Sequence, residues 1–202
     1  MIALGAIHQQ GALGTRKNMS VAHTWHQKAF EETRKLAEKD DPDAQNLLST
    51  FYAQGLGTDP NRAESIRWLR ASGKNGYLPA IMKLGSIYSR GENVMRDVEE
   101  ALQWIHMAAE LGEARAQYLL GKAYYESKTL ETDYPESYKW LLLSSNQGFE
   151  PSRMLMEELD MLLDKEELRE GRKRAGAFLD RITVWDPQEL EPREKGFMPA
   201  GP

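Results

Sequence analysis

The chain has 202 residues, carries a net charge of −5 and contains no cysteine. Without cysteine it cannot form disulfides, thiolate nucleophiles or cysteine-ligated zinc sites, and its acidic balance argues against nucleic-acid binding, which usually needs a basic surplus to meet phosphates. No apolar run approaches about 18 residues, so no transmembrane helix is expected. Because the N-terminus also lacks the leading positive charge and the apolar length of a secretory signal, we expect a cytoplasmic protein.

The first two predicted helices lie in residues 1–41. Trp25 and Ala29 occupy the buried face of the second helix, which is predicted to be about two turns longer than its later counterparts, near residues 31–38. Met1 already lies inside the first helix, with no helix start before it. We therefore expect the sequence to be a fragment, or to start late within a longer array.

A helix–turn–helix pattern then recurs with a period of 36 residues in units 42–77, 78–113 and 114–149. Such a period is typical of helical solenoids, whose units bury their apolar faces by stacking. One tryptophan per unit at helical spacing predicts core packing in preference to ligand stacking, so Trp104 is expected to lie buried between neighbouring repeats. The period is kept by Trp68, Trp104 and Trp140, by Ala44, Ala80 and Ala116, by Tyr52, Tyr88 and Tyr124, and by Gly76, Gly112 and Gly148.

Each second helix is predicted to begin with a capping box. In this device a short polar side chain accepts a hydrogen bond from the start of the helix, and a glutamate three residues later reaches back. The predicted pairs are Asn61 with Glu64, Asp97 with Glu100, and Asp133 with Glu136. Gly112 is predicted to end its helix as a left-handed cap.

The array is predicted to end in a half-unit, residues 150–163, that contributes one first helix. A further helix is predicted over residues 164–181, where Asp164 and Glu167 form another capping box. Its many arginines and lysines give it a polar side, so we expect it to cap the array, because terminal repeats need a hydrophilic outer face. Residues 182–202 contain four prolines and are predicted to form an irregular, mobile tail.

The third unit reads A-x-x-x-L-G-x-x-Y-x-x-G, a short turn, and then D-x-x-x-A-x-x-W-x-x-x-A-A-x-x-G. Its residues are Ala80, Leu84, Gly85, Tyr88, Gly91, Asp97, Ala101, Trp104, Ala108, Ala109 and Gly112. This pattern resembles the Sel1-like repeat, and the resemblance covers roughly residues 1–163, with departures at Ser49 and Ser127. It implies an all-α fold, a right-handed superhelical α-solenoid related to tetratricopeptide arrays, and a role as an adaptor in signalling or assembly. Without cysteine, the chain resembles the cysteine-free branch of the family.

The sequence offers little that could carry catalysis, since it has no S-x-x-K, H-E-x-x-H, G-x-S-x-G or P-loop motif. His23 and His26 could present two metal ligands on one helix, but no third ligand is evident. Glu157, Glu158 and Asp160 could mimic a catalytic carboxylate pair, although a solvated helix face explains them better. We therefore predict no enzyme, no cofactor and no metal; the alternative, once suggested for relatives, is a hydrolase of cell-wall or β-lactam substrates. The remaining histidines are His8, expected to be packed, and His106, expected to face solvent.

The first helices of stacked pairs are expected to line the concave face of the solenoid, so their side chains away from the core are candidate binding residues. The face would carry four positive charges and two tyrosines, a residue type enriched in binding hot spots. We predict an adaptor or regulator, including an inhibitor of one protein, that holds a partner protein or an acidic peptide, with no nucleic acid and no membrane insertion. The alternatives are ordinary solvated side chains and a structural spacer within a longer array. The predicted residues are Asn46, Thr50, Gln54, Lys83, Ser86, Arg90, Arg115, Tyr118, Lys122, Tyr125, Glu126, Met154, Leu155 and Glu158, of which Lys83, Arg90, Arg115 and Lys122 are the cations.

Overall fold

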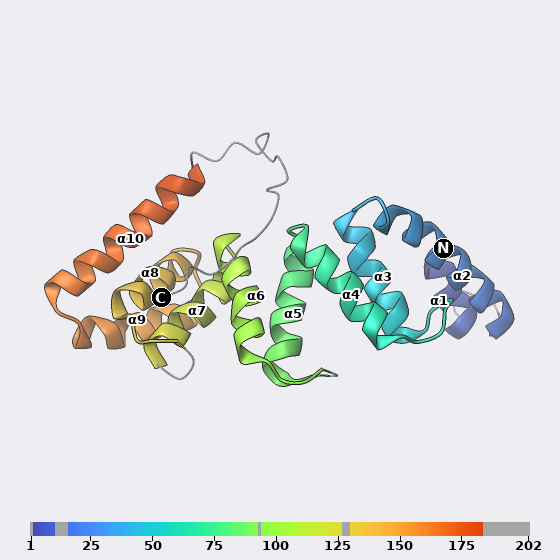
Figure 1. The fold of residues 1–202 in the computed structure, drawn as a ribbon, viewed down its shortest axis with the longest axis horizontal. Coiled ribbons are helices and arrows are strands. Elements are labelled where there is room, and N and C mark those ends of the chain that lie inside the picture. The colour runs from blue at the N-terminus through green and yellow to red at the C-terminus, as the bar shows by residue number, and fades with distance from the viewer. Residues whose placement is uncertain (1, 11–15, 93, 127–129, 184–202) are drawn as a thin grey trace.

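The computed structural model describes residues 2–10, 16–92, 94–126 and 130–183, and this part of the chain is helical without a strand (Figure 1). The predicted all-α fold is confirmed. The helices within these residues are α1 (Ile2–Gln10), α2 (Met19–Ala37), α3 (Pro42–Gln54), α4 (Arg62–Lys74), α5 (Leu78–Arg90), α6 (Val98–Glu110), α7 (Ala114–Glu126), α8 (Tyr134–Ser145), α9 (Glu150–Leu162) and α10 (Lys165–Thr183).

Consecutive helices form stacked hairpins. α3 packs on α4, α5 on α6 and α7 on α8, and each first helix also packs on the second helix of the preceding hairpin. The hairpins follow one another along the long axis of the molecule (Figure 1). The longer second helix predicted for the first unit is present, since α2 has 19 residues where α4 has 13. The predicted repeat solenoid is therefore confirmed.

Helix ends follow the predicted capping chemistry in part. The side chains of Asn61, Asp97 and Asp133 accept hydrogen bonds from the backbone N–H three residues on, as a capping box requires. The reciprocal bond from the glutamate to the cap is seen at Glu167, which accepts from the N–H of Asp164. At the other end, Gly112 has a φ of +86°, so the predicted left-handed cap is confirmed.

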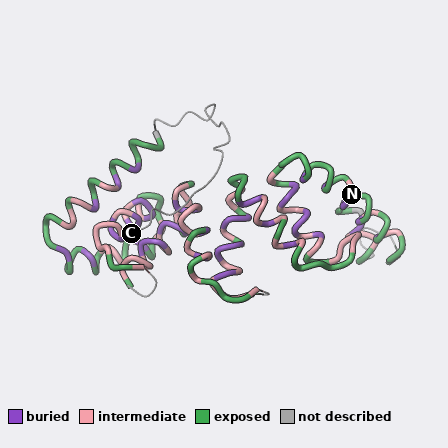
Figure 2. Tube along the Cα trace, in the orientation of Figure 1, coloured by how far each residue is buried: buried purple, intermediate pink, exposed green. Residues whose placement is uncertain are grey.

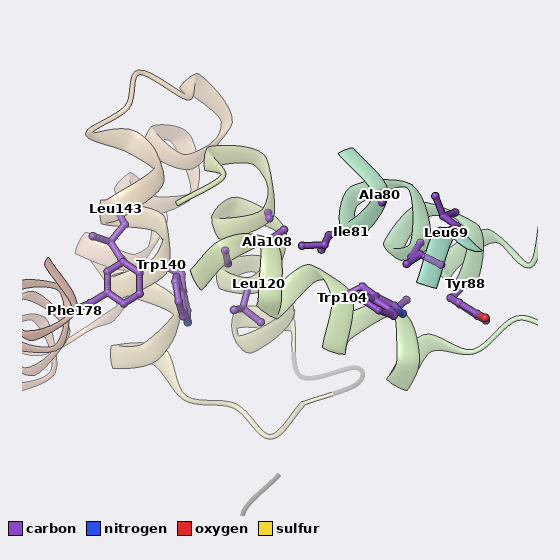
Figure 3. Close-up of a cluster of buried hydrophobic side chains, with 14 of the residues drawn as sticks. Leu69, Ala80, Ile81, Tyr88, Trp104, Ala108, Leu120, Trp140, Leu143 and Phe178 are labelled. Atoms are coloured by element: carbon purple, nitrogen blue, oxygen red, sulfur yellow. The ribbon is translucent and has the colours of Figure 1, made fainter. Parts of the chain in front are cut away.

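The core runs between hairpins. Trp104 is 7% exposed and reaches the preceding unit, where a Cβ added at Gly73 would lie 2.9 Å from the indole ring. Ala80 and Ala108 are completely buried, because small side chains let neighbouring helices approach closely. Figure 3 shows part of the main cluster of buried hydrophobic side chains, with Trp104 and Trp140 lying between successive helices. The predicted core position of Trp104 is confirmed.

Polar side chains cross some of the seams between units. Gln45 donates through Nε2 to the carbonyl oxygen of Ala37 in the preceding unit (3.2 Å), and its Oε1 accepts from Asn75 (2.9 Å). The same arrangement recurs two units later at Ala109, Gln117 and Gln147. In the unit between them, Ile81 and Leu111 stand at the positions of the two amides. These positions therefore carry amides in the second and fourth units and apolar side chains in the third, an alternation of polar and apolar seams.

α10 packs on α8 and does not return beside α9. The interior hairpins use seven-residue connections, 55–61, 91–97 and 127–133, whereas only Leu163 and Asp164 separate α9 from α10. This connection departs from those of the other hairpins, and α10 packs on α8 in place of forming a hairpin with α9. The predicted capping helix is therefore present, but it lies over the fourth hairpin and not over the end of the array.

Close packing and charge hold α10 in this place. A Cβ added at Gly171 would lie 3.0 Å from both the carbonyl oxygen of Pro135 and the side chain of Tyr138, so the two helices touch at this glycine. Phe178 packs edge-on against Trp140 with ring centroids 5.2 Å apart. Ion pairs join Arg174 to Asp133 and Glu136 at the start of α8, and Arg181 to Glu110 of α6.

Exposure is lowest along the sides of the helices that face their neighbours, and the free side of α10 is largely exposed (Figure 2). No helix among the described residues is long and apolar enough to cross a membrane. The tail predicted to be irregular and mobile lies almost entirely outside the described residues.

Candidate partner-binding face

The outward side chains of α3, α5, α7 and α9 form one continuous candidate surface, called here the first-helix face. Because the repeat is 36 residues, these side chains fall into rows that cross the four helices. The chemistry of the rows changes along the array: apart from one methionine, α3 and α5 contribute small or polar side chains, whereas two of the three rows carry tyrosine on α7 and methionine on α9. The rows are Asn46, Met82, Tyr118 and Met154; Thr50, Ser86, Lys122 and Glu158; and Ala53, Ser89, Tyr125 and Met161.

A groove of about 440 Å³ opens between the second and third units. Tyr52 of α3, Ile66 of α4 and Ile87 of α5 give it an apolar lining, and Lys83 and Ser86 stand in its wall. Two of the predicted binding residues, Lys83 and Ser86, thus share one concavity. Asn46 and Thr50 are half-buried and Gln54 is exposed, and none of these three lines the groove.

The four predicted cations are not equivalent. Arg90 pairs with Glu92 at 3.0 Å, and Lys122 pairs with Glu126 at 3.5 Å. Lys83 and Arg115 are exposed and have no ion pair with any carboxylate in the described part of the chain. The positive charge available to a partner is therefore concentrated on these two residues.

The predicted tyrosines contact residues of the following helices. Tyr118 lies 5.4 Å from the ring of Phe149, which caps α9. Tyr125 lies 6.2 Å from Tyr134, and its hydroxyl donates to Glu158 of α9 at 3.2 Å. Burial, followed by this hydrogen bond, raises the pKa of Tyr125. Both tyrosines are half-buried, so they support the α7–α9 seam while keeping part of each ring on the surface.

α9 presents two exposed methionines next to these tyrosines. Met154 is 67% exposed and Met161 is 83% exposed. Met154 was among the predicted residues, but Met161 was missed, although it stands 36 residues after Tyr125 and could have been found by strict use of the period. Leu155 is half-buried and packs on the α8–α9 core, so it is the least available of the predicted residues on this helix.

A model of the Sel1 repeat matches residues 1–32, 42–77, 78–113 and 114–149, more than half of the chain. The chain belongs to the Sel1 repeat family. No curated protein matches it.

Solved structures with the same repeat resemble this Sel1 array. A Sel1 repeat protein from Oxalobacter formigenes is 30% identical with a TM-score of 0.58, over 65% of this chain and 98% of its own. The uropathogenic Escherichia coli protein c5321, described as a protective antigen with an SLR fold, is 22% identical with a TM-score of 0.48, and this chain spans 50% of its length. The Pseudomonas aeruginosa immunity protein Pa5087 is 18% identical with a TM-score of 0.40, over 98% of this chain and 75% of its own. Nothing about the function of this array follows from the last two likenesses.

The histidines of this Sel1 array do not form a metal site within the described residues, where no cluster of metal-ligating side chains occurs. His23 is exposed whereas His26 is 6% exposed, so the two rings do not present ligands together. Burial, and then the neighbouring His23, lower the pKa of His26. The carboxylates of Glu157 and Glu158 lie on the exposed side of α9.

One histidine expectation was wrong. His106 does not face solvent freely: it is half-buried, and its ring centroid lies 5.8 Å from that of Trp140. Burial lowers the pKa of its imidazole. The imidazole packs edge-on against the Trp140 indole, which α8 of the following hairpin contributes. His8 is half-buried, as expected for the tyrosine position of the repeat.

Proposed function

We propose that this Sel1 array binds a protein partner on its first-helix face and acts as an adaptor or regulator, without catalysis. The observation that carries the proposal is the exposure of Met154 and Met161 on α9. These methionines continue the two rows that carry tyrosine on α7. Exposed apolar patches on folded proteins often mark sites of protein–protein contact.

Two further points support this proposal. Sel1 repeats commonly mediate protein–protein interactions and are typically non-enzymatic scaffolds. The face also offers polar anchors at a distance from the methionines, because Lys83 stands in the groove between the second and third units. A carboxylate of the partner, as expected from the sequence, would be accommodated beside this lysine.

Affinity capture with matched variants tests the proposal. The immobilised chain is exposed to an extract of the source cell, and bound proteins are quantified for wild type, for Met154→Gln with Met161→Gln, and for Met95→Gln. Glutamine keeps the length and helix propensity of methionine while removing its apolar surface. Met95 is the control because it is 89% exposed but lies in the α5–α6 connection, away from the face.

The proposal expects at least one protein that wild type and Met95→Gln capture equally and that the double variant loses by about tenfold, an interface effect of ordinary size. Equal recovery of every captured protein on all three chains would contradict it. So would a protein lost only on Met95→Gln, because the binding surface would then lie at the α5–α6 connection.

A further inference from the structure

The outward face of α9 is a narrow apolar stripe. Met154 and Met161 are separated by seven residues, about two helical turns, so they stand in line along the helix. The stripe lies opposite Ser152 and Leu159, both completely buried, and therefore points away from the core. Leu162, 55% exposed, widens it at the C-terminal end of the helix.

Within the described residues, nothing covers this stripe. On α7 the corresponding side chains are Tyr118 and Tyr125, which contact Phe149, Tyr134 and Glu158 of the segments that follow. α9 has no such neighbour in the described part of the chain, because α10 packs on α8. The stripe is thus a repeat surface of the kind that stacks on another helix.

Carboxylates flank the stripe on both sides. At about 100° per residue, Glu157 and Glu158 fall on either side of the line through the two methionines, and both are exposed. Glu150 and Asp160 add to the negative charge of α9, whose one basic residue, Arg153, pairs with Glu150 at 2.8 Å. Like charges across an interface cost free energy, so this surface disfavours a second copy of itself and any acidic helix.

We infer that the α9 stripe is the docking site for an amphipathic helix of the partner whose apolar side is flanked by lysine or arginine. This inference rests on the proposed function and specifies the partner segment. The side chains of Met154 and Met161 are flexible and polarizable, which suits packing against an apolar helix side. Glu157 and Glu158 would meet the basic rim of that helix and set its orientation.

Designed peptides of about 18 residues, long enough to form a helix on binding, serve as the probe. One peptide has a leucine stripe flanked by lysines, the second has the same stripe flanked by glutamates, and the third has the lysine peptide's composition in scrambled order. Binding to the full chain is measured by isothermal titration calorimetry at low and at moderate salt. The lysine peptide should bind at least about tenfold more tightly than either of the others, and added salt should weaken it by screening.

Variants locate the binding. Met154→Gln with Met161→Gln should weaken the lysine peptide about tenfold, since hot-spot side chains of an interface dominate its affinity. Glu157→Gln with Glu158→Gln should weaken it several-fold and remove most of its salt dependence. Met95→Gln should leave the affinity unchanged. Circular dichroism of each variant establishes that the helices remain formed.

Four results would overturn the inference. They are equal affinity for the lysine and glutamate peptides, no effect of the methionine variant, self-association of the chain that the methionine variant abolishes, and hydrogen-exchange protection of residues 184–202 that the same variant releases. The last two would assign the stripe to a second copy or to the chain's own tail. The capture experiment tests the proposed function separately. If capture from the extract depends on Met154 and Met161, the proposed function stands even when the peptides show no preference for basic charge.

Discussion

Tryptophans at one position of the repeat have different polar surroundings. The indole N–H of Trp104 donates to Glu100 at 3.2 Å, whereas those of Trp68 and Trp140 are buried without an acceptor in the described residues. One residue before the tryptophan, Arg67 and Lys139 pair with a glutamate of their own helix, whereas the third unit has glutamine there. Glu100 pairs with Arg70 of the preceding unit and still accepts from the indole. Arg67 and Lys139 lie over the indole faces, 4.4 Å from the Trp68 ring and 4.0 Å from the Trp140 ring.

Trp104→Ala should lower the free energy of unfolding by about 3–5 kcal/mol, because the cavity between two units is too large to close. Leu111→Ala is the control, since Leu111 is 52% exposed and lies in the following turn; its cost should be below about 1 kcal/mol. Urea unfolding followed by circular dichroism measures both. A cost for Trp104→Ala no larger than that of the control would contradict the core assignment.

Acidification should destabilise the fold through His26. Its pKa is lowered in the folded chain from 6.5, so the unfolded chain binds the proton more readily and stability is lost as the pH falls below about 6.5. The unfolding midpoint in urea should therefore decrease between about pH 7.5 and about pH 5.5. His26→Leu should show a smaller decrease than wild type, and His23→Gln serves as the exposed control. An unchanged pH dependence in His26→Leu would show that other groups cause the decrease.

At the scale of the helix, the sequence predicts nearly every element but not every position. Periodicity and caps predict the hairpins because each unit carries the signals for its own fold. The placement of α10 was not predicted, although its connection to α9 departs from the repeat, with two residues where the other hairpins have seven. The ion pairs of Arg90 with Glu92 and of Lys122 with Glu126 were also missed, because the two glutamates were not considered as local partners.

Two glycines of α10 test its packing on α8. Gly176 has no atom within 4 Å of an added Cβ, so Gly176→Ala should stabilise the chain by up to about 1 kcal/mol through helix propensity. Gly171 touches Pro135 and Tyr138, so Gly171→Ala should lose this gain and cost about 1–3 kcal/mol through overpacking. Thermal unfolding compares the two. Equal stabilisation by both substitutions would mean that α10 does not lie against α8.

At the scale of the whole molecule, the array is built from alternating seams. In the fourth unit Gln147 donates a hydrogen bond to Gln117, whereas the third unit has Ile81 and Leu111 at the corresponding positions. A repeat position can therefore carry a hydrogen-bonding or an apolar side chain, provided that the residue at the paired position is of the same kind. The period predicts the outward rows of the first helices, but it does not reveal which side chains on them stay free, since this depends on the contacts of each neighbour.

Paired replacement at this seam should be tolerated. Gln117→Ile alone removes a buried amide that donates to the carbonyl oxygen of Ala109 and accepts from the exposed Gln147. It should cost about 1–3 kcal/mol, because the buried carbonyl loses its side-chain donor. Adding Gln147→Leu copies the third unit and should return stability to within about 1 kcal/mol of wild type. Urea unfolding of the single and double variants measures the coupling. A double variant less stable than the single variant would show that the seams are not interchangeable.

The central claim is that a partner binds the first-helix face at α9. Methyl NMR of the chain labelled at its methionine methyl groups tests this most directly, by titration with the protein recovered in the capture experiment. The signals of Met154 and Met161 should shift or broaden in proportion to binding, while those of Met19 and Met95, exposed elsewhere on the array, should not change. Shifts at Met19 or Met95 with Met154 and Met161 unaffected would place the partner on another surface and contradict the claim.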